Sequence, residues 1–159
     1  PGLEWVMIGH LQSNKAKLVA RFAAEFQALD TLSLAAELDR RLHAEGRQLD
    51  VLIQVNSSGE ASKSGRPPED VVGFARALVP FDALRVRGLM TLALPSSDPA
   101  LVGACFDRVV DAQRRLREAA VDGQSYDELS MGMSGDFELA IAHGATEVRI
   151  GTAIFGARA

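Results

Sequence analysis

The sequence predicts an α/β fold of the (β/α)8-barrel type, and three observations support this prediction. Strand-like and helix-like patterns alternate six times, with strands expected near residues 5, 27, 51, 86, 128 and 147. Such alternation indicates a parallel sheet covered by helices. No Gly-x-Gly-x-x-Gly motif follows the first strand, which disfavours a dinucleotide-binding fold. Small or polar residues follow several strands, as they do at the functional end of such barrels.

Composition limits the class of protein. The chain has 159 residues, of which 47% are hydrophobic and 24% are charged, enough for one globular domain. A net charge of −4 and scattered arginines disfavour nucleic-acid binding. No apolar run is long enough to span a membrane and no signal peptide is visible, so we expect a cytoplasmic protein without membrane or nucleic-acid partners. The single cysteine, Cys105, falls on an apolar helix stripe and is expected in the core.

The chain opens with two short strand–helix units. The apolar run Trp5–Ile8 predicts a strand covered on both faces. The helix after it is expected to bury Leu18, Val19 and Phe22, which recur at helical spacing. Phe26 either extends that stripe or opens a short strand that ends at Leu29.

The next elements have stronger signals. Thr31 or Ser33 is expected to cap a helix that ends at Gly46. Leu49–Val55, rich in β-branched residues, predicts a buried strand. The helix that follows is expected over Pro68–Leu78, because proline is favoured in the first turn of a helix.

A strand over Leu84–Leu92 precedes the longest helix. That helix is expected to begin after Asp98, with Pro99 in its first position, and to end near Ala120. Its buried stripe is predicted to contain Leu101, Val102, Cys105, Phe106, Val109, Ala112 and Leu116.

The last two units end in similar turns of small residues. The strand Leu129–Met133 leads through Ser134 into a helix over Phe137–His143, and the strand Thr146–Ile150 leads into the turn Gly151–Thr152. Backbone N–H groups at such strand-to-helix turns are free to bind anions. Loops after the last two strands of a (β/α)8 barrel commonly build a phosphate site. We therefore expect a phosphate between Ser134 and the Gly151–Thr152 turn, against the alternative of an ordinary connection.

Three further side chains are candidates at strand ends. Arg149 lies two residues before the last turn, where it either borders a ligand or forms a salt bridge inside the barrel. His10 follows the first strand, and Asn56 begins a long polar loop after the third. For both, a loop residue that bonds to backbone or water is the alternative to a ligand contact.

Six segments in order resemble one family, the pyridoxal phosphate homeostasis proteins, which share the barrel of the alanine racemase N-terminal domain. They are Trp5–Lys15, Gln54–Asn56, Lys63–Gly65, Arg87–Met90, Leu129–Ser134 and Arg149–Gly156. The resemblance spans essentially the whole chain. It implies a non-catalytic carrier or buffer of pyridoxal 5′-phosphate (PLP), with no catalytic residues and no metal.

The resemblance also implies a cofactor site. The phosphate of PLP would lie against Ser134, Gly151 and Thr152, and Arg149 would face the pyridine nitrogen. Met133, His10 and Asn56 complete the set of implied cofactor-binding residues. A cation beside the pyridine nitrogen keeps that nitrogen unprotonated and weakens the ring as an electron sink.

Two family segments have no counterpart here, including the strand that carries the Schiff-base lysine. The lysines of this chain, Lys15, Lys17 and Lys63, do not match that position. We therefore expect a single domain, residues 1–159, that holds the last six βα units of the family barrel and lacks the first two. Either a preceding segment or a second copy of the chain is then expected to cover its open sheet edges.

Two other functions compete with a PLP carrier. The first is a PLP-dependent amino-acid racemase, which the lack of a second domain and of a well-placed tyrosine base disfavours, since Tyr126 precedes its strand. The second is a barrel that binds another phosphorylated ligand.

Overall fold

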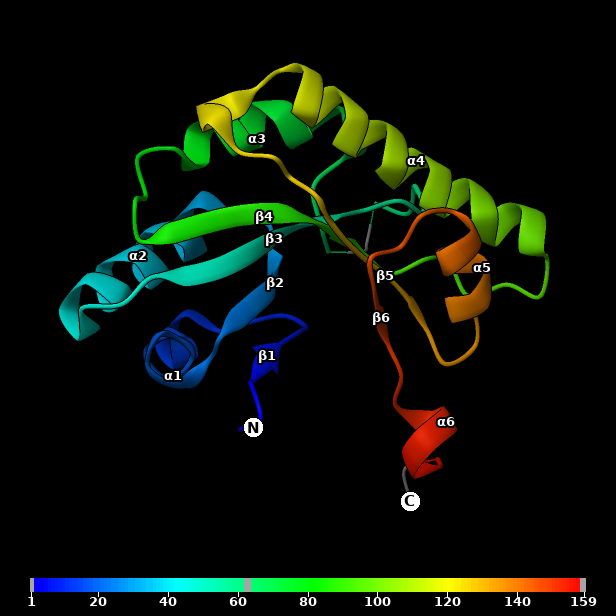
Figure 1. The fold of residues 1–159 in the computed structure, drawn as a ribbon, viewed down its shortest axis with the longest axis horizontal. Helices are drawn as coiled ribbons and strands as arrows, with labels where there is room; N and C mark the ends of the chain where they lie inside the picture. Colours follow the sequence, from blue (N-terminus) through cyan, green and yellow to red (C-terminus); the bar gives the residue numbers. More distant parts are fainter. Residues whose placement is uncertain (1, 62–63, 158–159) are drawn as a thin grey trace.

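The six strands form one parallel sheet whose spatial order follows the order of the chain. The computed structural model describes residues 2–61 and 64–157. Figure 1 shows the sheet curled, with β1 and β6 at its two ends and an opening between them. The strands are β1 (Val6–Met7), β2 (Glu25–Leu29), β3 (Leu49–Val55), β4 (Leu84–Thr91), β5 (Glu128–Met133) and β6 (Glu147–Arg149).

The helices connect successive strands and lie mainly along the outside of the curl (Figure 1). No helix within the described ranges is long and apolar enough to cross a membrane. The helices and 3-10 turns are η1 (Ser13–Lys15), α1 (Ala16–Phe22), α2 (Leu32–Glu45), η2 (Pro68–Asp70), α3 (Val71–Leu78), α4 (Pro99–Glu118), η3 (Val121–Gly123), α5 (Phe137–Ala142) and α6 (Thr152–Phe155).

The curl brings strands together that are not neighbours in the sheet. The carboxamide of Gln27 on β2 hydrogen-bonds to Ser130 on β5 and to Glu147 on β6. These bonds cross the inner face of the sheet, because β3 and β4 separate β2 from β5 in the strand order. The architecture is therefore a half-barrel of six βα units, which confirms the predicted fold class.

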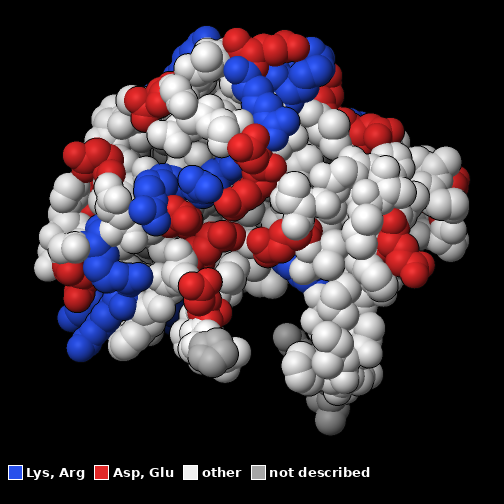
Figure 2. Space-filling view, viewed as in Figure 1, with Lys and Arg blue, Asp and Glu red and all other residues white. Residues whose placement is uncertain are grey.

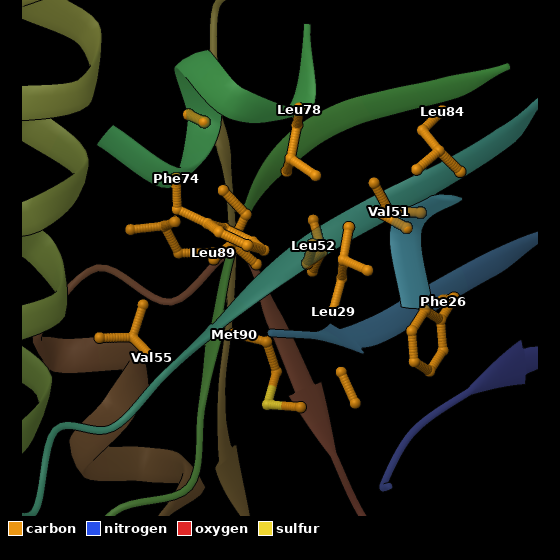
Figure 3. Packing of buried hydrophobic residues seen from close by; sticks show 14 of the residues in the cluster. Phe26, Leu29, Val51, Leu52, Val55, Phe74, Leu78, Leu84, Leu89 and Met90 are labelled. Carbon is orange, nitrogen blue, oxygen red and sulfur yellow. The ribbon is translucent and has the colours of Figure 1, made fainter. Parts of the chain in front are cut away.

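The outer face of the sheet forms the main hydrophobic core. Figure 3 shows Phe74 and Leu78 of α3 over one side of β3 and β4, with Leu89 beneath them. Met90 lies on the other side of the strands in the same view. Leu52 and Leu89 are fully buried, and burial of each such side chain contributes about 2 kcal/mol.

The helix boundaries agree closely with the sequence signals. Thr31 caps α2, since its hydroxyl accepts the backbone N–H of Leu34 at 3.3 Å. Gly46 ends α2 with a positive φ of 62°, a conformation that glycine adopts without strain. Asp98 caps α4 in the same way, accepting from the N–H of Ala100.

The predictions of a fully covered first strand and of two apolar helix stripes are wrong in part. Trp5 is 69% exposed, because β1 pairs only with β2 among the described strands. Leu18 and Phe22 of α1 are exposed as well, although Val19 is buried. Leu101 is exposed on α4, while the remaining residues of its predicted stripe are buried. Phe26 belongs to β2 and not to α1.

Close approach of β4 and β5 requires a glycine. Gly88 pairs with Glu128 where the two strands first meet. A Cβ atom on residue 88 would overlap the backbone carbonyl oxygen of Glu128. Any larger residue would therefore force the two strands apart.

Gly88→Ala should consequently lower the free energy of unfolding, by about 1–3 kcal/mol or more, the usual cost of overpacking. Gly73→Ala on α3 is the matched control, because a Cβ there meets no atom within 4 Å. Alanine at this helix position should stabilise by about 0.5–1 kcal/mol. Urea titration of both variants measures the change in the free energy of unfolding. Equal stability of the two variants would contradict the overlap expected between a Cβ at residue 88 and Glu128.

Candidate functional site

A cavity of about 440 Å³ opens at the carboxyl ends of β3, β4 and β5. Its walls are largely apolar, with Met90 and Leu92 from the end of β4. Polar side chains contribute at fewer points, and Gln54 of β3 is one of them. A cavity of this size and character suits a small organic ligand.

Three of the residues implied by the resemblance line this cavity, namely His10, Asn56 and Met133. They come from the ends of β1, β3 and β5, so the curled sheet brings together residues that lie far apart in the sequence. The carboxamide of Asn56 also shapes its own loop. It donates to the carbonyl of Glu60 at 2.8 Å and accepts from the hydroxyl of Ser58 at 3.1 Å.

The two turns that were expected to hold a phosphate face each other. The hydroxyl oxygen of Ser134 accepts the backbone N–H groups of Gly151 and Ala153, both at 3.2 Å. Two N–H groups from one turn thus converge on a single oxygen atom of the other turn. Gly151 occupies the N-cap position of α6, and Thr152 is the first residue of that helix.

Arg149, on β6, is not among the residues that line the cavity, but its partners adjoin them. It pairs in register with Met133, and its Nη2 donates at 2.7 Å to the carbonyl of Thr91, the residue between Met90 and Leu92. Its Nη1 donates to the hydroxyl oxygen of Ser130 at 2.6 Å. Among the described residues Arg149 makes no salt bridge.

One N–H of Arg149 is left without an acceptor. The Nε atom is buried and has no hydrogen-bond partner among the described residues. Burial lowers the pKa of Arg149 from its usual value, and the carboxylates of Glu147 and Asp136 oppose that shift. Arg66 and Arg115 also have a buried Nε atom without a hydrogen-bond partner among the described residues, so this feature is shared by three arginines.

Acidic side chains stand at the amino ends of several strands, with Glu25, Glu128 and Glu147 as the first residues of β2, β5 and β6. Figure 2 shows acidic and basic side chains interspersed on the visible face. Burial raises the pKa of Glu25 to about 7, the hydrogen bond from Gln27 opposes the shift, and the charges of Glu147, Glu128 and Asp50 add to it. Glu25 is therefore partly protonated near neutral pH.

Other candidate reactive groups lie away from the cavity. Tyr126 is buried, donates from its hydroxyl to the carbonyl of Val121 at 2.7 Å, and has its pKa raised to about 12 by burial and by Asp122. Cys105 is buried in α4, as expected. Lys15 and Lys17 are exposed, and Lys63 lies outside the described residues.

Sequence patterns did not reveal the groups that hold Arg149. Gln27 and Ser130 are fully buried, and each lies between apolar neighbours in its strand. A polar residue inside a strand that is covered on both faces is the available signal, because buried polar groups need partners.

Comparison with known proteins gives consistent matches over nearly the whole chain. The family model described as alanine racemase, N-terminal domain, matches residues 2–159. The pyridoxal phosphate homeostasis protein of Pseudomonas aeruginosa is 45% identical over 157 residues, which cover 98% of this chain and 65% of that protein. The chain thus spans less than two thirds of this curated relative.

Solved structures agree with this match. PipY from Synechococcus elongatus, solved with PLP bound, is 33% identical with a TM-score of 0.88, over 98% of this chain and 72% of PipY. An alanine racemase from Clostridium difficile shares the fold with a TM-score of 0.78 at 15% identity, over 99% of this chain and 41% of the racemase.

The raised pKa of Glu25 predicts a pH-dependent stability. The unfolded chain ionises this carboxyl near 4.5 and the folded chain near 7, so stability falls as pH rises through that interval. Glu25→Gln should therefore stabilise the protein at pH 8 by about 1 kcal/mol, allowing for solvent contact, and by much less below pH 4.5. Thermal melts across this pH range measure the difference. Glu69→Gln, at an exposed carboxyl, is the control, and a pH-independent effect of Glu25→Gln would contradict the assignment.

Proposed function

We propose that this chain binds PLP as a carrier or buffer. The chain belongs to the alanine racemase N-terminal domain family and, within it, to the pyridoxal phosphate homeostasis proteins. The observation that carries the proposal is the convergence of two strand-to-helix turns, where the N–H groups of Gly151 and Ala153 meet on Ser134, at the same end of the sheet as a cavity of about 440 Å³. The name of the P. aeruginosa relative and the PLP bound to PipY support it. The resemblance implies a cytoplasmic setting, which is part of the proposal.

The phosphate of PLP would bind where the two turns meet. The N–H groups of Gly151 and Ala153 already converge on the Ser134 hydroxyl oxygen, so a phosphate oxygen would find donors prepared for it. Thr152 would add its hydroxyl from the same exposed turn. We assign Ser134, Gly151 and Thr152 to this end of the site.

The pyridine ring would lie in the cavity with its nitrogen toward Arg149. An unprotonated ring nitrogen is an acceptor, and the guanidinium of Arg149 carries N–H donors. His10, Asn56 and Met133 would line the remaining walls. When bound, PLP supplies an electron sink and an aldehyde that reacts with amines, and a permanently charged guanidinium at the nitrogen weakens the former.

A carrier fits the described residues better than an enzyme does. Amino-acid racemisation needs proton donors and acceptors at the substrate carbon. The hydroxyl of Tyr126 is engaged by Val121 and has a pKa near 12, so this side chain is a poor base. An enzyme would interconvert L- and D-alanine in the presence of PLP, whereas a carrier would leave each enantiomer unchanged.

Arg149→Glu should weaken PLP binding at least tenfold, because a carboxylate would favour the protonated ring nitrogen and repel the phosphate. Equilibrium dialysis gives the affinity and the absorbance spectrum reports the ring. Arg76→Glu makes the same charge change at an exposed position of α3 and should bind PLP like the wild type. Equal affinity and identical spectra for Arg149→Glu and wild type would remove Arg149 from the site. A chain that binds inorganic phosphate at this site but not PLP would favour another phosphorylated ligand.

The chain by itself should not hold PLP covalently. Lys15 and Lys17 are exposed and are not among the residues that line the cavity, so neither amine is placed to reach the aldehyde of a ligand bound there. Borohydride treatment and peptide mass mapping should therefore find no stoichiometric pyridoxyl adduct. A stoichiometric adduct on Lys15, Lys17 or Lys63 would show that the covalent anchor lies in this chain.

A further inference from the structure

We propose that Gln27 is a positioning residue for Arg149. It orients the hydroxyl of Ser130, and it hydrogen-bonds to the carboxylate of Glu147. The role of Gln27 in positioning Arg149 rests only on contacts within this chain. Its consequence for PLP affinity rests on the function proposed above.

The orientation of the Gln27 carboxamide is fixed by its partners. Its side-chain nitrogen donates to Glu25 at 2.5 Å and to Glu147 at 2.6 Å, and its oxygen accepts from the Ser130 hydroxyl at 2.6 Å. The carboxylate of Glu147 accepts and does not donate, so the amide nitrogen must face it and the amide oxygen must face Ser130. Gln27 is fully buried, and both its amide nitrogen and its amide oxygen are hydrogen-bonded.

The orientation of the Gln27 carboxamide determines that the Ser130 hydroxyl accepts a hydrogen bond from Arg149. A hydroxyl has one proton, and Ser130 gives it to Gln27. The oxygen lone pairs therefore remain for Nη1 of Arg149 at 2.6 Å. The carbonyl of Thr91, fixed in β4, holds Nη2. Two anchors thus set the plane of the guanidinium and leave Nε–H free of partners.

Gln27 also removes a competitor for Arg149. Glu147 and Arg149 lie two residues apart on β6, so their side chains leave the strand on the same face. An unoccupied carboxylate at Glu147 would attract the guanidinium into an ion pair. The Gln27 amide holds that carboxylate, so Arg149 stays on Ser130 and Thr91.

The test compares Gln27→Met, which keeps the volume and removes every hydrogen bond, with Gln113→Met. Gln113 is also buried, but its amide bonds only to the carbonyl of Tyr126 among the described residues. The first measurement is the nitrogen-15 NMR signal of Arg149 Nε–H without ligand, assigned by its loss in Arg149→Lys. The second is PLP affinity by equilibrium dialysis.

In Gln27→Met the Arg149 signal should shift and lose order, and PLP affinity should fall about tenfold. Gln113→Met should change neither. Adding Glu147→Gln to Gln27→Met removes the competing charge and should restore affinity to within about threefold of wild type. A general loss of packing would not be rescued in this way.

An unchanged Arg149 signal in folded Gln27→Met would overturn the proposal, and so would failure of the double variant to recover. If Gln27→Met does not fold, Ser130→Ala breaks the same link with a smaller change and must alter the Arg149 signal. If the wild type binds no PLP while the Arg149 signal still responds to Gln27→Met, the proposed function fails and the positioning role stands.

Discussion

The inner face of the sheet is held by hydrogen bonds between strands that are not neighbours. In most parallel sheets both faces are apolar, and packing against helices supplies the stabilisation. Here the outer face follows that rule, whereas the inner face carries Gln27, Ser130 and Arg149. Gln27 and Ser130 are buried and Arg149 is half-buried, and the hydrogen bonds between Gln27 and the other strands exist only when β2 approaches β5 and β6. The polar groups on the inner face can therefore be hydrogen-bonded only if the sheet curls.

Much of the fold could be predicted from local patterns. Leu49–Val55, the caps at Thr31 and Asp98, and the end of α2 at Gly46 agree with the structure, because each depends on a few adjacent residues. The prediction failed at Trp5–Ile8. An apolar run indicates burial only if neighbouring elements cover it, and periodicity says nothing about whether they are present.

The position of the candidate site was predictable to the extent that the candidate residues lie at strand ends. Parallel strands bring their carboxyl ends to one edge, which placed His10, Asn56 and the Ser134 turn in one region. The support of Arg149 was not predictable in this way. Gln27 and Ser130 are 103 residues apart in the chain, and their contact depends on the curvature of the whole sheet, which no local pattern encodes.

The hydroxyl of Ser134 occupies the N–H groups that an anion would use. Under the proposed function, binding would be an exchange in which the phosphate replaces the Ser134 hydroxyl as the acceptor of these two N–H groups. Because the hydroxyl already holds the turn in place, little conformational entropy would be lost on binding. The hydroxyl would then compete with the bound ligand for the same N–H groups, which would favour release. A protein that must hand on its cargo gains more from this arrangement than one that must retain it.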